Sequence, residues 1–333
     1  MKKRIFCMNA VGLVLLAVFL SSCGLKYNIK DPSLSEINYG KSAISQTTMG
    51  IVDKRTGDNK NYVLGKIGPW GGLKDISDLL TIENIKDPLG FLSANLEKEL
   101  NQRGIPVKVS VNAPGEKELV LEVNRYQILN YRSTGFSPWE ACHVFEGTLV
   151  QGQKRISIKA YFYNGKVPVW SMDELQDPCF STPSSILIKD IASKINKIVF
   201  NLQAPDTTIN QLTADIDAEL SKDSKTGPLW KVLELGYTNN PLAMPALKKY
   251  SSEGDGLFKS GALSAIGILG AEDQIDFLKE RYNNSQYNEK YMAVKAIGDV
   301  GNDKAQALLR EMKKEKVYEA EGALKSCVDL YVP

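Results

Sequence analysis

The stretch GALSAIGILGAEDQIDFLKE (261–280) reappears in outline as MAVKAIGDVGNDKAQALLRE (292–311), 31 residues further along the chain. The shift aligns three pairs of small residues: Ala265 with Ala296, Gly267 with Gly298, and Gly270 with Gly301. A repeat of fixed length predicts stacked helical hairpins, each of which buries its apolar face on the next. The alanines and glycines allow close helix approach, and the last glycine pair is expected where helices end and the chain turns.

The repeat can be followed outward in both directions. One step earlier, Leu235, Gly236, Leu247 and Lys248 keep the register. A lead-in helix is expected in TINQLTADIDAELSKD, and VYEAEGALKSCVDL is expected to close the stack. The A-I-G-x-[LV]-G segments resemble short HEAT-type repeats. This resemblance implies an all-α solenoid domain at 227–333, with 204–226 as a connecting helix or linker.

Residues 41–203 have a different periodicity. RISIKAYFY (155–163) alternates apolar and polar residues, as does a strand with one covered face and one wetter face. Further strands are expected in SQTTMGIV, NYVLGKI, PVKVSV, KELVLEVNRY and KVPVWSM. Asp87-Pro88 predicts the start of a helix that stops at Gly104, and an apolar stripe from Ile188 to Leu202 predicts a second helix across the sheet. The order predicts an α+β domain, an antiparallel sheet with two packed helices.

The start of the chain carries an export pattern. Three basic residues precede a mostly apolar run, and Leu20-Ser21-Ser22-Cys23 follows. This segment resembles a bacterial lipobox. The resemblance implies that 1–22 is a signal peptide and that Cys23 is lipidated, with acyl chains such as palmitate, and becomes the first mature residue. An ordinary secretory signal and an uncleaved anchor helix are the alternatives.

The residues that follow Cys23 bear on where the anchored chain lies. Gly24, rather than aspartate, implies the outer membrane, with the protein facing the periplasm. The polar segment 23–40 shows no clear period and is interpreted as a tether.

Three segments add a second resemblance. MGIVDKR (49–55), LGKIG (64–68) and FLSANLEKELNQRGIPVKV (91–109), together with the lipobox, resemble the small periplasmic α+β lipoproteins, of uncharacterised and ABC-transport auxiliary types. The resemblance implies a periplasmic adaptor or a lipid-transport accessory. It brings no catalytic residue.

Charge and cysteine content narrow the classes further. The formal net charge is +2, from 41 basic and 39 acidic residues, and leaves no basic footprint for nucleic acid. Cys142 and Cys179 lie in one predicted domain of an exported chain, so a disulfide between them is expected, with two buried free thiols as the alternative. Cys327 is expected to be a small core residue.

The sequence offers few residues that could form a catalytic or metal site. The one histidine, His143, follows Cys142, and neighbours on a strand point to opposite faces, so the two make a poor dyad. A zinc site at these two residues and Cys179 is less favoured than the disulfide. Neither a metal nor a cofactor is predicted. Trp70 and Trp139 lie in Gly/Pro-rich loops, either tucked onto their own domain or offered to a partner, and are the candidate partner-binding residues.

These patterns lead to one functional expectation with two alternatives. The first is a lipid-anchored periplasmic adaptor that binds an envelope protein through its helical repeats, without catalysis. The second is a lipid-binding or small-ligand-binding accessory subunit of an envelope transport system. The third is an enzyme that acts on cell wall or pigment, for which no catalytic constellation is visible.

Overall fold

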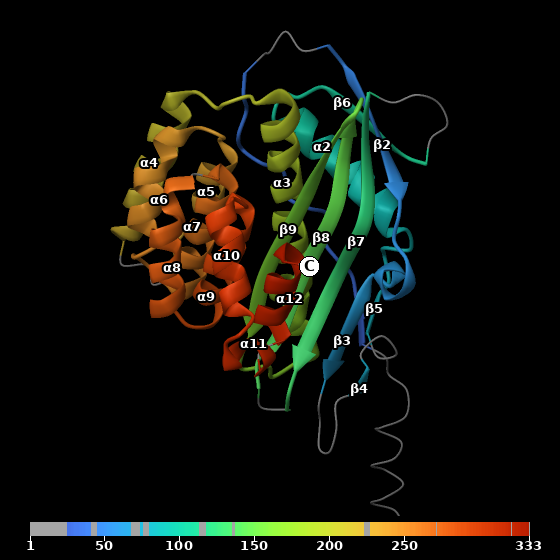
Figure 1. The fold of residues 1–333 in the computed structure, drawn as a ribbon, viewed down its shortest axis with the longest axis vertical. Helices are drawn as coiled ribbons and strands as arrows, with labels where there is room; N and C mark the ends of the chain where they lie inside the picture. The colour runs from blue at the N-terminus through green and yellow to red at the C-terminus, as the bar shows by residue number, and fades with distance from the viewer. Residues whose placement is uncertain are drawn as a thin grey trace, which may run out of the picture.

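The computed structural model describes residues 25–40, 45–67, 74–75, 80–112, 118–134, 137–222, 227–270, 272–320 and 322–332. The expected signal peptide, the expected lipidated Cys23 and Trp70 lie outside these residues. The structure is a mixture of α and β, with one large mixed sheet and many helices (Figure 1). Within the described ranges, no helix is both long and apolar enough to cross a membrane.

The large sheet is built around one long central strand, β7. Its strands are β2 (Thr47–Asp53), β3 (Val63–Ile67), β4 (Lys74–Asp75), β6 (Val107–Val111), β7 (Leu119–Arg132), β8 (Trp139–Gln151) and β9 (Lys154–Lys166). β7 pairs in parallel with β2 through its first half and with β3 through its second half, and β2 pairs in parallel with β6. β8 and β9 continue antiparallel from β7.

The expectation of an antiparallel sheet is therefore wrong for three of the six strand pairings described in this sheet. The chain crosses from β2 and β3 to β6 and β7 through the helix α2 (Pro88–Gln102), and a crossover of this kind returns the chain in the same direction. The strand expected in KVPVWSM is also wrong. β9 ends at Lys166, and the next five residues form a loop in which Val167 and Trp170 are exposed.

One face of the sheet is covered by α2 and by α3 (Thr182–Ile195), which the turn η4 (Asn196–Phe200) extends. The predicted start at Asp87-Pro88 is confirmed. The predicted apolar stripe is confirmed for Ile188, Ile191 and Ile195, which are buried, whereas Ile198 is half-buried in η4 and Leu202 lies beyond the helix. Three short turns complete this half: η1 (Gly57–Lys60), η2 (Met172–Leu175) and η3 (Gln176–Ser181).

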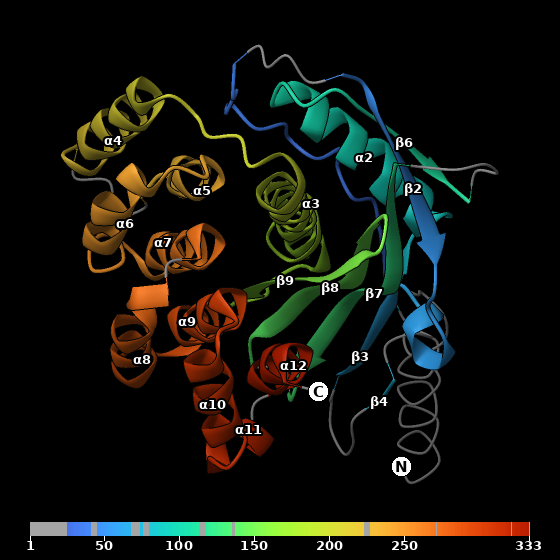
Figure 2. The ribbon, with the colours of Figure 1, turned by 45° about the horizontal axis from the view of Figure 1, so that its top comes forward.

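The remainder of the chain is helical. Its elements are α4 (Asp206–Leu220), α5 (Leu229–Tyr237), η5 (Pro241–Ala243), α6 (Met244–Tyr250), α7 (Gly256–Leu269), η6 (Glu272–Gln274), α8 (Ile275–Asn284), α9 (Tyr287–Val300), α10 (Asp303–Met312), α11 (Lys316–Ala320) and α12 (Gly322–Tyr331). We call these elements the helical array. α5, α7 and α9 pack side by side as an inner row, and α6, α8 and α10 lie outside them (Figure 2).

The sequence repeat has a direct counterpart in this packing. A Cβ atom at Gly236 would lie 2.6 Å from the Cα of Ala265, and one at Gly267 would lie 2.5 Å from the Cα of Ala296. Equivalent glycines therefore contact equivalent alanines of the next inner helix. The predicted helix ends are confirmed as well, because Gly270 (φ 67°) and Gly301 (φ 68°) are left-handed C-caps.

The two halves of the chain share one core. α3 contacts α5 and α7, α9 contacts β9, and α12 covers β8 and β9 on the sheet face opposite to α3 (Figure 2). The hydroxyl of Tyr161 donates to the carbonyl of Ala323 at 2.9 Å, and the rings of Tyr163 and Tyr291 meet edge to face at 4.6 Å. The expected wetter sheet face is consequently covered, and β9 is buried on both faces from Ala160 to Tyr163.

The segment expected to be a tether packs against the body from residue 25 onward. β1 (Leu25–Tyr27) pairs in parallel with β5 (Leu80–Ile82). Tyr27, Ile29, Ile37 and Tyr39 are all buried. These residues alternate at period two with exposed neighbours, which is the signal that the interpretation as a tether overlooked.

Candidate functional site

Two groups of buried charged side chains join α3 to the helical array. The first, which we call the closed cluster, consists of Glu99, Arg103, Lys189 and Glu234. The second, the open cluster, consists of Asp190, Lys194, Lys295 and Asp299. Lys189 and Asp190 are neighbours on α3, so the two clusters diverge from one point of that helix.

The closed cluster is sealed by the N-terminal segment. Arg103 forms an ion pair with Glu99 at 2.7 Å, and Lys189 lies 3.4 Å from Glu234. The backbone N–H of Ser35 donates to Glu99 at 3.1 Å, and the Ser35 hydroxyl donates to Glu234. All four charged side chains are at most 4% exposed. Two cations and two anions make this cluster neutral, and segment 33–39 covers it.

The open cluster surrounds Asp299 of α9. Lys295 lies 2.7 Å from Asp190 and 2.9 Å from Asp299. Lys194 reaches the other oxygen of Asp299 at 2.5 Å, and the hydroxyl of Tyr331 donates to that same oxygen at 2.6 Å. Burial raises the pKa of Asp299, but the ammonium groups of Lys194 and Lys295 outweigh it and hold this pKa below its usual value. Asp299 is therefore the charged centre of the cluster.

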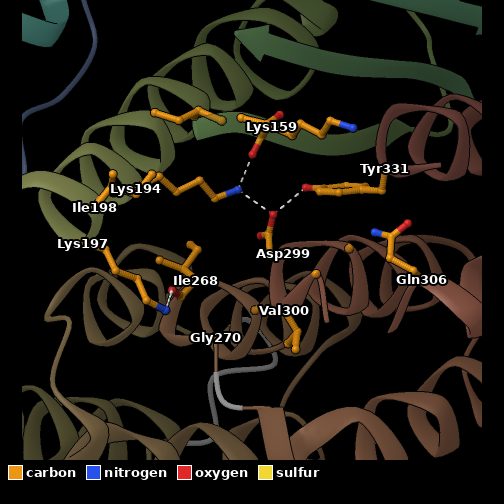
Figure 3. A pocket seen from close by; sticks show the side chains of 15 residues that line it. Lys159, Lys194, Lys197, Ile198, Ile268, Gly270, Asp299, Val300, Gln306 and Tyr331 are labelled. Atoms are coloured by element: carbon orange, nitrogen blue, oxygen red, sulfur yellow. Dashed lines mark hydrogen bonds and ion pairs between the residues drawn. The ribbon is translucent and has the colours of Figure 1, made fainter. Parts of the chain in front are cut away.

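Beside the open cluster lies a cleft of ≈ 450 Å³ (Figure 3). Its walls come from β9, from the end of α3 with η4, and from α7, α9, α10 and α12. Lys159, Lys194 and Lys197 contribute ammonium groups, and Gln306 and Tyr331 contribute an amide and a phenol. Gly267, Gly270, Gly298 and Gly301 line the α7 and α9 side of the cleft, and a Cβ atom at Gly270 would collide with the Nζ of Lys197.

The three lysines are held by different partners. Lys194 also donates to the carbonyl of Lys159, and Lys197 donates to the carbonyl of Leu269 at 2.7 Å, at the C-terminal end of α7. Lys159 lies 3.9 Å from Glu146. Burial lowers the pKa of each of these three ammonium groups, more than the nearby carboxylates raise it. Lys159 and Lys194 are half-buried and Lys197 is exposed. An anion that entered the cleft would offset the cost of burial at the first two.

The cleft and the open cluster together carry an excess of positive charge. The charged side chains around them are four ammonium groups and three carboxylates: Lys159, Lys194, Lys197, Lys295, Asp190, Asp299 and Glu146. One positive charge is left over, whereas the closed cluster is neutral. Amines, an amide and a phenol that converge on a cleft suit a small anion such as a phosphate or carboxylate group. Among the described residues, no group of histidine, cysteine and carboxylate side chains could hold a metal ion.

The expected disulfide is wrong. Cys142 and Cys179 are free and fully buried. On β8, Cys142 points toward Tyr161, whose hydroxyl donates to its sulfur at 3.2 Å, on the α12 side of the sheet. His143 points the other way, and its Nε2 lies 3.0 Å from the carbonyl of Cys179. The two thiols thus lie on opposite faces of the sheet. The opposite orientation of Cys142 and His143 is confirmed.

Of the two tryptophans predicted to bind a partner, the structure describes only Trp139. Trp139 is 1% exposed, and its ring nitrogen donates to the side chain of Asn130 at 3.0 Å, so it is a core residue and not a partner-binding one. Trp70 lies outside the described residues. Trp170, in the stretch interpreted as a strand, is 84% exposed. The cleft lysines were also missed. Lys159 stands on the expected wetter face of its strand, and a lysine beside a cleft on an amphipathic helix gives the same sequence pattern as a solvated one.

Comparisons with known proteins give no family. No family model matches the chain, and no curated protein matches it. Protein XCC0632 from Xanthomonas campestris, of family model DUF330, is similar in structure with 14% identity and a TM-score of 0.31, over 53% of this chain and 94% of that one. An uncharacterized protein is similar with 13% identity and a TM-score of 0.30, over 54% of this chain and 100% of that one. At these TM-scores the likeness assigns neither a family nor an activity.

Proposed function

We propose that this chain is a lipid-anchored, non-catalytic binding protein of the cell envelope, and that it holds a small anionic ligand in the cleft beside Asp299. The observation that carries the proposal is the convergence of Lys159, Lys194 and Lys197 on one cleft with an unbalanced positive charge. A phosphate group, free or in a lipid headgroup, has the matching charge and several acceptor oxygens.

The test is thermal unfolding with two probes, inorganic phosphate and dihexanoyl phosphatidic acid. At about 100 times its Kd a ligand stabilises the folded chain by about 2.7 kcal/mol. A rise in Tm is expected for the unmodified chain, and a much smaller rise for Lys159→Gln. Lys304→Gln is the matched control, because Lys304 is an exposed lysine paired with Asp276 on the outer helices. An equal response of both variants would contradict the cleft as the site. A response to phosphatidic acid alone would identify a lipid ligand.

The anchor has its own test. Mass spectrometry of the mature protein is expected to find an acylated N-terminal Cys23, and Cys23→Ser is expected to release the protein from membranes. An unmodified Cys23 would remove the anchor and leave the cleft proposal standing.

A protein adaptor is the second candidate, motivated by the likeness of the array to HEAT-type repeats. The inner row is covered by α3 and the sheet, so a partner would contact other surfaces of the array. Leu242 and Tyr287 of the array are 47% and 66% exposed. A photo-crosslinking residue at position 287 is expected to trap one envelope protein in stoichiometric amount, and position 304 is the control. Crosslinks that do not differ between the two positions would contradict this candidate.

A further inference from the structure

The loop 167–171 carries the most exposed large apolar side chain in the described part of the chain. Trp170 is 84% exposed and Val167 is 58% exposed. The register pairs Lys166 at the end of β9 with Trp139 at the start of β8, so the loop leaves the sheet at the end opposite to the β8–β9 hairpin. The exposure of two apolar side chains in one short loop is unfavourable in water, and such a patch often marks a contact with a partner or a membrane.

The first described residues of the chain pack against the segment that follows this loop. Residues 27–30, at the end of β1 and just after it, pass along the segment 177–181. The backbone N–H of Lys30 donates to Ser181 and its ammonium group to Asp177, and the ring of Tyr27 lies 4.6 Å from that of Phe180. Asp173 is close enough to add to the effect of burial in raising the pKa of Tyr27. The segment 27–30 therefore lies against residues 173–181, which follow the Trp170 loop directly in the chain.

Leu25 is the first described residue of the chain. Leu25 and Val169 pack against the same small apolar cluster, whose buried members are Tyr27, Ile29, Leu80, Ile82, Ile85, Ile128, Trp139, Ala141, Leu175, Cys179 and Phe180. Cys23 stands two residues before Leu25, and two residues of chain span at most about 7 Å. Acyl chains on Cys23 would thus begin near the loop that exposes Val167 and Trp170.

The charges at this end of the molecule are paired. Lys26 lies 2.9 Å from Glu83, Lys30 lies 2.7 Å from Asp177, and Lys166 lies 3.3 Å from Glu174. This balance does not favour an anionic surface over a neutral one. The exposed apolar groups of this surface are the indole of Trp170 and the side chain of Val167. Tryptophan is enriched at the boundary between lipid headgroups and acyl chains.

We propose that the loop 167–171 is a second membrane contact, in which Trp170 and Val167 enter the interface of the bilayer that holds the acyl chains of Cys23. The inference rests on the proposed anchor at Cys23. Two contacts at one end fix the orientation of the protein: the sheet end with Trp170 faces the lipid and the β8–β9 hairpin faces away. A single acylated residue at the end of a chain would leave this orientation free.

The test couples the chain from Cys23 onward, which contains every described residue, to a maleimide lipid in phosphatidylcholine vesicles. Cys142, Cys179 and Cys327 are buried, so Cys23 is the thiol that reacts. In a Trp70→Phe background, quenching of tryptophan emission by lipids with brominated acyl chains is measured. Trp170→Phe is expected to remove most of the quenching, because Trp139 is buried. Trp230→Phe is the matched control and is expected to retain the quenching.

Two outcomes would overturn the inference. One is equal quenching in the Trp170→Phe and Trp230→Phe chains. The other is quenching that appears only in vesicles of anionic lipid and disappears with salt, since paired charges predict the same quenching in neutral and anionic vesicles. Chemical coupling makes the test independent of natural lipidation. Failure of the anchor would appear as an unmodified Cys23 in cells, and failure of the loop contact as unquenched Trp170.

Discussion

The closed and open clusters are built from the same kinds of residues, yet they have different surroundings. Each joins α3 to an inner helix of the array, through Glu234 of α5 in the closed cluster and through Lys295 and Asp299 of α9 in the open one. The closed cluster is neutral and covered by segment 33–39. The open cluster, with two ammonium groups and two carboxylates, is neutral by itself as well. It borders the cleft, where Lys159 and Lys197 add the excess positive charge. The residue types and the charge balance of the two clusters are thus alike. What separates a structural ion network from a candidate binding site here is the cover over the first and the further lysines around the cleft beside the second.

The largest effect is expected from removal of the helical array. A chain that ends at residue 203 loses the partners of Asp190, Lys189 and Lys194 and uncovers the α12 side of β8 and β9. We expect this chain to aggregate or to lack fixed tertiary packing, measured by gel filtration and near-ultraviolet circular dichroism. A monomer with a native-like near-ultraviolet spectrum would show that the halves are independent and that the clusters do not hold them together.

The next effect separates the buried members of each cluster from those at the cleft. Lys295→Met leaves Asp190 without its closest cation, and removal of one partner of a buried pair costs about 3–5 kcal/mol. Arg103→Met in the closed cluster is expected to cost as much, since Glu99 is then buried without its partner. Urea unfolding measures both. A loss below about 1 kcal/mol in either variant would mean that water reaches that cluster.

The pH dependence of the unfolding free energy distinguishes two groups that acid can protonate: His143 in the sheet and the carboxylates of the clusters. Burial lowers the pKa of His143 to about 4 from its usual 6.5. The imidazole stays neutral in the folded chain while the unfolded chain takes up a proton below pH 6.5. The stability present above pH 6.5 is therefore lost as the pH falls toward 4 and changes no further below it. For this one group the loss is about 3 kcal/mol.

His143→Gln provides the control for that measurement, because it cannot titrate and can still donate to the carbonyl of Cys179. The difference in unfolding free energy between the two chains is expected to change between pH 6.5 and 4. What remains in His143→Gln belongs to carboxylates, including those of the clusters. A difference that is independent of pH would contradict a neutral buried His143.

The smallest effect is expected at the rim of the cleft. Lys159→Gln removes an ammonium group 3.9 Å from Glu146, and partly exposed pairs of this kind contribute at most about 1 kcal/mol. The loss of stability should resemble that of Lys304→Gln, while the response to phosphate differs. A large loss in urea unfolding would place Lys159 among the structural ion pairs, as in the closed cluster.

Several local features were predictable because neighbouring residues decide them. Asp87-Pro88 starts α2, Gly270 and Gly301 end α7 and α9, and the small residues of the repeat lie where inner helices approach closely. The candidate site was hardly predictable. Its lysines come from β9, α3 and η4, and its backbone wall comes from two inner helices at least 70 residues later in the chain.

The amino-acid sequence alone determined the helices, most of the strands and the repeat, since these follow from backbone preferences and from periodicity within a few residues. Tertiary structure alone decided the parallel pairing of β2, β3 and β7, the packing of segment 25–40, and the placement of Cys142 and Cys179 on opposite faces. It also decided which charges are sealed and which face a cleft. The physical reason is that burial and charge balance depend on surfaces contributed by distant segments, and only folding brings those surfaces together.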